Sequence, residues 1–312
     1  MHLRRIFNRR IMSHPTLVTQ ERSFSSTVQP KSFWYKSFTQ GEIGGRFSFQ
    51  EDTYKGVILQ LTESVDSRME AEEFRSRMSA TMMYLKEKGY SKGLWLKLGR
   101  LNAHLVPILV EEFSFDFHHV DKGTSLTLSR WLSGSSPSGL PDGASHSVGV
   151  GAVVTDGEGR VLLVREKSGP AGRMRIWKFP TGRVDRGEDL SAAVVRELKE
   201  EVGLDSNFKG VLMVREGHGG ADYLGELSDL FFVCLLEASN HAGDLVLQPE
   251  EIEEAKWVHV LELPEVCKYP NGSSGEAMID CIGNFFRSGH LPWTKSTHSS
   301  WRQCQPHTIF RQ

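Results

Sequence analysis

The residues best suited to do chemistry are three glutamates that crowd the end of one amphipathic segment, GRVDRGEDLSAAVVRELKEEVGL, residues 182–204. Apolar residues recur there at every fourth position, which predicts a helix with one buried stripe. The stripe residues are Leu190, Val194, Leu198 and Val202. At about 100° per residue, Glu197, Glu200 and Glu201 fall on an arc that borders this stripe. Gly203 is expected to end the helix.

The crowding of these acids is unfavourable for an isolated helix. Glutamates three or four positions apart repel by about 0.2–0.5 kcal/mol per pair, and the helix dipole favours cations at this end. Arg196 and Lys199 offset only part of the repulsion. A solvated charged face is the ordinary interpretation of a glutamate-rich helix. A bound divalent cation would remove the conflict, and hard oxygen ligands suit Mg²⁺ or Mn²⁺, which also coordinate substrate phosphates.

The spacing of the whole segment resembles the Nudix box, the signature of the Nudix hydrolases. The pattern is a glycine, five residues, Glu, seven residues, and then Arg-Glu-aliphatic-any-Glu-Glu-any-Gly-aliphatic. Every defined position is filled, by Gly182, Glu188, Arg196, Glu197, Leu198, Glu200, Glu201, Gly203 and Leu204. The resemblance implies an α/β/α sandwich with a mixed sheet and an enzyme that hydrolyses phosphoanhydrides with Mg²⁺ or Mn²⁺.

The resemblance also assigns roles around the metal. Glu200 and Glu201 would ligate it, and the Gly182 carbonyl would supply a further oxygen. Glu197 would be either a ligand or the general base, and Arg196 would orient a glutamate. Such an arrangement suits diphosphate hydrolysis, which requires charge neutralisation, an oriented water and a stabilised leaving oxygen.

Other residues are expected at the edges of the site. Glu188 and Gly203 would be structural within the motif. A further metal-ligating acid is expected before the strand that contains Trp257. Glu251 matches that position best, and Glu250 and Glu254 are its rivals. The basic residues that could contact substrate phosphates, with a solvated surface charge as the ordinary alternative for each, are Lys178, Arg183 and Arg215.

The composition is that of an ordinary globular protein, with 39% hydrophobic and 24% charged residues among 312. A net charge of -2 gives no electrostatic reason to expect nucleic acid or a membrane as a partner. No apolar run approaches the length needed to span a bilayer. Four widely spaced cysteines form no CxxC pair, which indicates neither a disulfide framework nor a structural zinc site.

The first 28 residues have the composition of an organellar transit peptide. Arginines appear from Arg4 onward, whereas the first acid is Glu21. Arg22-Ser23-Phe24-Ser25-Ser26 resembles the end of a mitochondrial presequence. The sequence predicts a mitochondrial protein, with a plastid or the cytosol as alternatives, and sequencing the amino terminus of the mature protein would test this.

Residues 40–132 predict a smaller α/β module. Strands are expected at 57–61, 94–98 and 126–132. A helix capped by Asp66 or Ser67 should end at Gly89, and a shorter helix should span 105–113. His118 and His119 are expected in a strand, with one side chain pointing inward and the other outward.

Several segments extend the resemblance to one Nudix subgroup, the plant ADP-ribose/NADH pyrophosphatases and the animal antisense-fibroblast-growth-factor Nudix protein. They are GLWLKL, HLVPILVEEFSFDFHH, TLSRWL and LPDGASHSVGVGAVV, and the similarity covers roughly residues 53–266. The subgroup implies an acetyltransferase-like shape for the first module, ADP-ribose or NADH as substrate, and a homodimer. Coenzyme A or another dinucleotide is the alternative substrate. A non-catalytic nucleotide-binding or partner-binding regulator on the same scaffold is the alternative function.

The second half of the chain predicts one further domain. Residues 133–143 are rich in Ser, Gly and Pro, which is typical of a linker. A Nudix domain is expected after it, at 144–292. Strands are expected at 148–154, 161–164, 208–215 and 229–236, and a final helix at 275–287. A basic loop is expected at 169–175, and a second, glycine-rich loop at 218–227 could close over a ligand. Residues 293–312 are expected to be a mobile tail.

Overall fold

The computed structural model describes residues 47–61, 68–121, 123–134, 136–218, 227–239, 245–288, 294–298 and 307–311. The chain divides into two compact units that meet in the sequence between Gly143 and Ala144. The expected transit peptide at 1–28 lies outside the described residues, as does most of the expected closing loop. Within the described ranges, no helix has both the length and the apolar character needed to cross a membrane.

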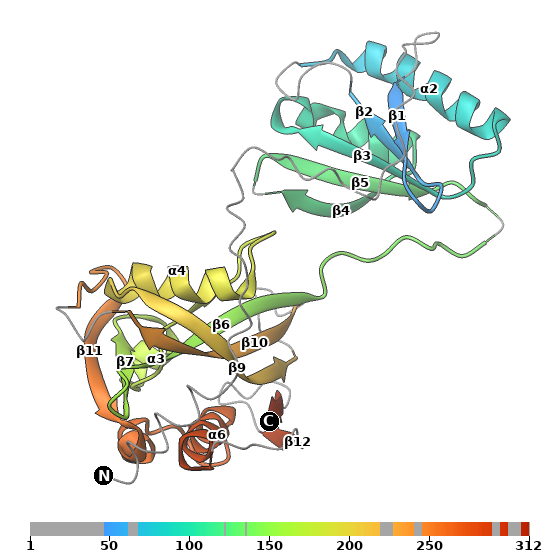
Figure 1. The fold of residues 1–312 in the computed structure, drawn as a ribbon. Coiled ribbons are helices and arrows are strands. Elements are labelled where there is room, and N and C mark those ends of the chain that lie inside the picture. Colours follow the sequence, from blue (N-terminus) through green and yellow to red (C-terminus); the bar gives the residue numbers. More distant parts are fainter. Residues whose placement is uncertain are drawn as a thin grey trace, which may run out of the picture. The chain divides into compact units, whose positions relative to one another are not determined.

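The N-terminal unit is built on a five-stranded mixed sheet (Figure 1). In sheet order the strands are β1 (Ser48–Glu51), β2 (Val57–Gln60), β3 (Gly93–Gly99), β5 (Ser125–Trp131) and β4 (Asp116–Asp121). The pairing of β2 with β3 is parallel, and the other neighbours are antiparallel. Leu94, Leu96 and Leu98 alternate along β3 into a core that also takes up the apolar face of α2 (Ala71–Glu87). The expected acetyltransferase-like shape of this unit stays a prediction.

Helix α2 begins later than the sequence predicts. Its first residue follows Glu70, whose side chain makes no capping hydrogen bond, and the expected caps Asp66 and Ser67 lie outside the described residues. Phe74, Met78 and Leu85 are buried, as their spacing requires. Gly89 adopts a φ of 74° just beyond the helix, a conformation that glycine takes without strain.

Two other expectations for this unit are wrong. The segment expected as one helix at 105–113 contains two short irregular turns, a 3₁₀ helix (Arg100–Leu105) and a π helix (Ile108–Glu112). Pro107 stands between them, and its missing N–H interrupts a regular helical ladder. His118 and His119 do not point to opposite sides. A bulge in β4 brings both half-buried rings together, with their Nδ1 atoms 2.6 Å apart.

The C-terminal unit is built on an eight-stranded mixed sheet. In order the strands are β11 (Ile252–His259), β7 (Arg160–Glu166), β6 (His146–Thr155), β10 (Ser228–Ala238), β9 (Ser206–Gly217), β13 (His307–Arg311) and β12 (Thr294–His298). The short strand β8 (Thr181–Arg183) pairs with β6 off this path. Strands β6 and β10 are parallel, and the other pairs are antiparallel. The predicted mixed sheet is confirmed.

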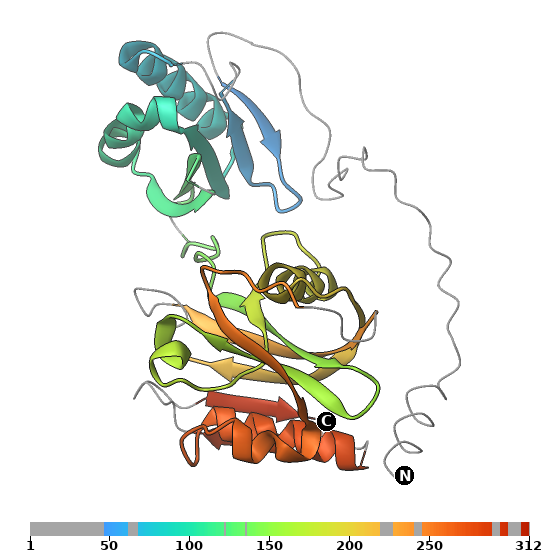
Figure 2. The same cartoon turned by 90° about the vertical axis from the view of Figure 1, so that its left-hand side faces the viewer.

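Two helices cover opposite faces of this sheet (Figures 1 and 2). Val153, Leu163 and Val233 lie in one core with α6 (Ser274–Ser288), whereas alternate residues of the same strands lie in a second core with α4 (Leu190–Val202). This alternation follows from the two-residue period of a strand. The predicted α/β/α sandwich is therefore confirmed. Cys234, Cys267 and Cys281 are buried in these cores.

Two predictions for this unit need correction. The segment 169–175 is not simply a loop, because it contains the short helix α3 (Gly169–Arg173). The predicted mobile tail at 293–312 instead supplies β12 and β13, and β13 pairs with β9. The edge of β9 offers unpaired backbone groups, which a further strand satisfies whatever the polarity of its side chains. The prediction of a mobile tail, which was based on polar composition alone, was therefore wrong.

Candidate active site

Helix α4 carries most of the box and is closed by a glycine. The helix begins after Asp189, and Gly203 adopts a φ of 71° at its C-terminal end. A Cβ on Gly203 would lie 2.8 Å from the Cβ of Val246, so no larger residue fits there. The sequence suggested that Lys199 offsets part of the repulsion among the box acids, but its ammonium group does not contact them. It donates to the Gly203 carbonyl and to Asp205 instead.

Arg196 is the centre of the ion-pair network in the box. Its guanidinium group binds both carboxylate oxygens of Glu188, each at 2.8 Å. It also donates to Glu197 at 2.9 Å, to Glu200 at 3.1 Å and to the backbone carbonyl of Arg183 at 3.0 Å. One planar cation therefore links the loop before α4 to two successive acidic positions on the helix.

Glu188 holds the loop between β8 and α4 in place. Besides pairing with Arg196, its carboxylate accepts a hydrogen bond from the Asp185 amide at 3.0 Å. The hydrogen bond from Arg196 lowers the pKa of Glu188 to about 2, and the Asp185 amide adds to this shift. Glu188 thus remains ionised across the physiological range and acts on the site through Arg196 and the loop.

Replacement of Glu188 by glutamine should lower turnover by about 10- to 100-fold, the range for residues that support a site from outside it. Because the folded pKa lies below the ordinary 4.5, this ion pair stabilises the fold above pH 4.5, and its contribution is lost as the pH falls toward 2. Melting temperatures between pH 2 and 7 should show this loss in the wild type and not in Glu188→Gln. Glu158→Gln, at an exposed pair 3.6 Å long, serves as the control. Unchanged acid sensitivity in Glu188→Gln would contradict the assignment.

Residue 182 must be a glycine because the Glu197 side chain occupies the space that a Cβ would take. Strand β8 runs beside β6, with Gly182 opposite Val150, and this pairing brings its backbone against α4. A Cβ on Gly182 would lie 1.9 Å from the carboxylate carbon of Glu197. Glu197 also accepts a hydrogen bond from the Arg183 amide at 3.2 Å. Its burial raises its pKa above the ordinary value, although Arg196 opposes this shift.

Glu201 is the most unusual acid in the site. It is only 3% exposed, and its Oε2 atom has no hydrogen-bond partner among the described residues. Burial raises its pKa to about 8, although the charge of Lys178 and a hydrogen bond from the Thr181 backbone lower it. A buried carboxylate oxygen without a partner is costly. This atom therefore calls for a cation when the carboxylate is ionised.

The donor set fits a divalent cation in its chemistry. Glu197, Glu200 and Glu201 supply hard oxygens of the kind that Mg²⁺ and Mn²⁺ prefer. The unpartnered Oε2 of Glu201 and the close approach of the Gly182 backbone are the structural observations that support such an ion. Across the part of the chain that the structure describes, no group of three His, Cys, Asp or Glu side chains is arranged as a metal site. Arg196 instead engages two of the acids.

Lys178 joins the box to a neighbouring cavity. Its ammonium group pairs with Glu166 at the end of β7 and donates to the Thr181 hydroxyl at 2.6 Å. Both Lys178 and Glu166 act electrostatically on Glu201. Glu166 has no recognisable spacing from the box in the sequence, because only the pairing of β7 with Lys178 brings it here.

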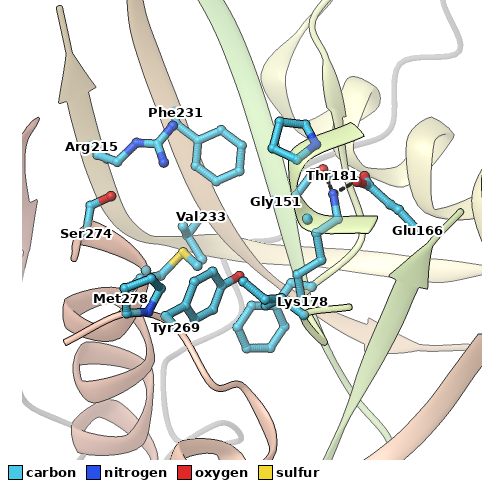
Figure 3. Close-up of a pocket in the computed structure, with 16 residues that line it drawn as sticks. Gly151, Glu166, Lys178, Thr181, Arg215, Phe231, Val233, Tyr269, Ser274 and Met278 are labelled. Carbon is cyan, nitrogen blue, oxygen red and sulfur yellow. Dashed lines mark hydrogen bonds and ion pairs between the residues drawn. The ribbon is translucent and has the colours of Figure 1, made fainter. Parts of the chain in front are cut away.

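A cavity of about 240 Å³ begins at Lys178 and continues between the sheet and α6 (Figure 3). Lys178 and Arg215 both line it, as the sequence predicts for substrate-contacting cations, whereas Arg183 is exposed and outside its lining. The side chains that sequence reasoning missed are Glu166, Thr181, Phe231, Tyr269, Ser274 and Met278. They come from distant segments and share no local pattern.

The structure gives the position of the additional acid expected before β11 but does not show it as a metal ligand. Glu251 is exposed in the turn before that strand, and its carbonyl accepts the Lys167 amide at 2.8 Å. The same turn is tied to the end of α4, since the Gln248 amide donates to the Glu201 carbonyl at 2.9 Å. Its rival Glu254 instead pairs with Arg165 at 2.6 Å, and Glu250 is exposed. The role of Glu251 as a ligand stays a prediction.

Comparison with known proteins identifies the family to which this chain belongs. A sequence model of the NUDIX domain matches residues 145–276, and a second one, described as a Nudix hydrolase domain, matches residues 47–132. Nudix hydrolase 7 of Arabidopsis thaliana is 36% identical over 214 residues, which make up 68% of this chain and 72% of that protein. The chain belongs to the Nudix hydrolases.

Two further relatives of this Nudix hydrolase come from a plant and from an animal. Nudix hydrolase 8 of Arabidopsis thaliana is 38% identical over 69% of this chain, and the matched region spans 55% of that relative's length. The protein "Nucleoside diphosphate-linked moiety X motif 6" of Xenopus laevis is 37% identical over 52% of this chain and 71% of its own length. The resemblance expected from the sequence is confirmed.

Proposed function

We propose that this Nudix hydrolase cleaves the diphosphate bond of a nucleoside diphosphate linked to another moiety, with ADP-ribose or NADH as the leading substrates. The observation that carries the proposal is the buried, unpartnered carboxylate oxygen of Glu201, which lies beside Lys178 at the start of a cavity. Acids that bind a cation lie next to a pocket here. This arrangement suits a substrate whose phosphates contact the cation while another part of it occupies the pocket. The choice of ADP-ribose or NADH rests on the subgroup resemblance.

The box acids would hold the divalent cation. Glu201 and Glu200 would bind it through their carboxylates, with Glu197 and the Gly182 carbonyl close by. When bound, such an ion neutralises the diphosphate and polarises the phosphorus centre toward attack by water. Arg196 would have to release part of its hold on Glu200, whereas its bidentate pair with Glu188 keeps the guanidinium group in place.

The remaining steps fall to residues of the chain itself. Glu197 is proposed as the general base, because burial raises its pKa above the usual range of a glutamate and so improves its ability to accept a proton from water. The Arg183 amide fixes the orientation of this carboxylate. Lys178 lies at the start of the cavity with its charge toward Glu201, where it would pair with a substrate phosphate oxygen.

The test is a substrate panel with purified protein, Mg²⁺ or Mn²⁺, and an EDTA control. We expect hydrolysis of ADP-ribose or NADH to be faster than that of coenzyme A or dinucleoside polyphosphates. Preference for coenzyme A or another dinucleotide would move the proposal to the alternative substrate. Binding of these ligands without any hydrolysis would instead favour a nucleotide-binding regulator on the Nudix scaffold.

We further propose a mitochondrial location and a homodimer. The arginine-rich and acid-poor first 28 residues support the location, and the subgroup resemblance supports the dimer. Fusion of residues 1–28 to a fluorescent reporter tests the first proposal, and a plastid or cytosolic signal would contradict it. Light scattering on the purified chain tests the second, and a monomeric mass would contradict it.

A further inference from the structure

The five-stranded sheet of the N-terminal unit has a second face, opposite the core that contains α2 (Figure 1). Three leucines of β3 point into that core. Because side chains alternate along a strand, Gly93, Trp95 and Lys97 lie on the other face. Strand pairing places further residues of this face beside them. These are Ile58 of β2 and Thr127, Ser129 and Trp131 of β5.

The segment after β5 packs on this second face. Leu140 lies over Gly93, where a Cβ would be 2.5 Å from the Leu140 Cδ2 atom. The Pro141 carbonyl oxygen lies 3.1 Å from the Nε2 atom of His118, within hydrogen-bond distance. We refer to residues 139–141 as the strap. Part of the predicted linker therefore packs on the sheet.

The strap, the sheet and the turn between β1 and β2 border a groove of about 900 Å³. This volume is within the roughly 300–1,000 Å³ of pockets that bind small molecules. The lining is mostly apolar, and the ring of Tyr54 in the turn is 77% exposed. Exposed apolar surface that is gathered in one place is typical of a binding site. The groove therefore has the size and character of a site for a small organic molecule.

One cation in the groove has no carboxylate partner. The Lys97 ammonium group pairs with Asp121 at 2.8 Å. The Asp52 carboxylate accepts hydrogen bonds from two backbone amides of its own turn. Among the described residues, Lys92 pairs with no acid, and its Nζ atom lies 5.6 Å from the centre of the Trp131 ring, within the range of a cation–π contact. Lys92 is therefore the charged group that is left to meet an anionic ligand.

Trp95 offers a directed hydrogen-bond donor in the same groove. Its ring lies edge-to-face with that of His118, with the ring centres 4.9 Å apart. Its Nε1 atom lies 3.2 Å from the position of a Cβ on Gly93 and has no hydrogen-bond acceptor among the described residues. The Nε1 atom of Trp131, by contrast, donates to the Ser136 hydroxyl at 3.3 Å. Because a partly buried indole N–H normally has an acceptor, the Trp95 donor is available to a ligand.

We propose that this groove binds a small organic anion with an aromatic body. The body packs on the aromatic and apolar floor, and the anionic group accepts the Trp95 N–H and pairs with Lys92. These two groups lie at the same end of the groove, since Lys92 directly precedes Gly93 and the Trp95 Nε1 atom lies beside Gly93. The site belongs to the N-terminal unit and involves no residue of the box. It therefore goes beyond the proposed function and does not rest on it.

The test is calorimetry on the full chain in EDTA, with 2-naphthoate and its neutral analogue 2-naphthamide as probes. The two have the same aromatic body and differ in charge. We expect 2-naphthoate to bind with a Kd on the order of 0.1–1 mM, the affinity typical of a ligand of this size. The amide should bind about two- to fivefold more weakly, because it lacks the attraction to the exposed Lys92. High salt should remove this difference.

Two variants separate the contributions of charge and hydrogen bond. Lys92→Gln should weaken 2-naphthoate about two- to fivefold and leave 2-naphthamide unchanged. Trp95→Phe keeps an aromatic ring and removes the N–H, so both probes, which each carry an acceptor oxygen, should bind about two- to tenfold more weakly. Lys86→Gln, at an exposed lysine of α2 on the other side of the sheet, is the control and should bind both probes like the wild type. Melting curves establish that each variant is folded.

Three results would overturn the inference. The first is that neither probe binds the wild type. The second is that 2-naphthamide binds as tightly as 2-naphthoate at low salt. The third is that Lys92→Gln and Trp95→Phe both bind 2-naphthoate like the wild type, because the probe would then occupy another part of the protein. Failure of the proposed function would appear separately, as an absence of nucleotide hydrolysis in the wild type with Mg²⁺.

Discussion

Glu201→Gln is expected to lower turnover by about two to four orders of magnitude, because it removes a charged group that acts mainly in the transition state. The same change should not destabilise the metal-free protein. Burial raises the pKa of Glu201 to about 8, so near neutral pH the metal-free carboxyl is largely protonated and resembles the neutral amide. The measurements are turnover of the best substrate with Mg²⁺ and melting temperature in EDTA.

The pH dependence of stability makes this prediction specific. The folded pKa of Glu201 lies above its ordinary value of 4.5. As the pH rises from 4.5 to 8, the unfolded chain loses this proton first, and the stability of the metal-free wild type should fall. Glu201→Gln lacks that fall and should become the more stable of the two in EDTA. Added Mg²⁺ should stabilise the wild type more than the variant, by linkage.

Two comparisons test the catalytic assignment. Glu200→Gln should also lose turnover, because it removes the second proposed metal ligand. Glu262→Gln, at an exposed glutamate of the 3₁₀ turn Val260–Glu262, should keep it. Full activity in both Glu200→Gln and Glu201→Gln would eliminate the catalytic function of the box. Marked instability of Glu201→Gln in EDTA would show that this residue holds the fold together as an ionised carboxylate.

Gly182→Ala is expected to cause a comparable loss of activity by steric displacement. The added Cβ would lie 1.9 Å from the carboxylate carbon of Glu197 and about as close to two further atoms of that side chain. Either Glu197 leaves its hydrogen bond to the Arg183 amide, or β8 moves away from α4. We expect turnover to fall at least a hundredfold, and stability to fall by about 1–3 kcal/mol, the range for an overpacked site.

The matched control is Gly134→Ala, where a Cβ would meet nothing within 4 Å. It makes the same chemical change at a position that is open and lies outside the site, so activity and melting temperature should remain those of the wild type. A double variant, Gly182→Ala with Glu197→Ala, removes the clash and should recover stability but not turnover. Near-normal activity in Gly182→Ala would show that the close approach of Gly182 to Glu197 is not required.

The sequence by itself determined the parts of this protein that depend on local spacing. The four-residue period of Val194, Leu198 and Val202 is enough to define which side of α4 is buried, because helical geometry fixes the angle between successive residues. The strands predicted at 148–154 and 161–164 likewise lie within β6 and β7. The Nudix box was recognisable because all of its defined positions lie within one strand–loop–helix unit, which keeps their order and spacing on the chain.

Only the tertiary structure decided the parts that depend on pairing between distant segments. Sheet pairing brings Glu166 to Lys178, and the connection after α5 (Leu263–Val266) brings Tyr269 to Arg215, although neither pair has a fixed spacing in the sequence. The tertiary structure also gives two cationic side chains partners that the sequence did not predict. Arg196 binds three glutamates and not one, and Arg215 is neutralised by Asp229. The partners of a charge are set by which surfaces fold together, and residue spacing along one segment carries no information about them.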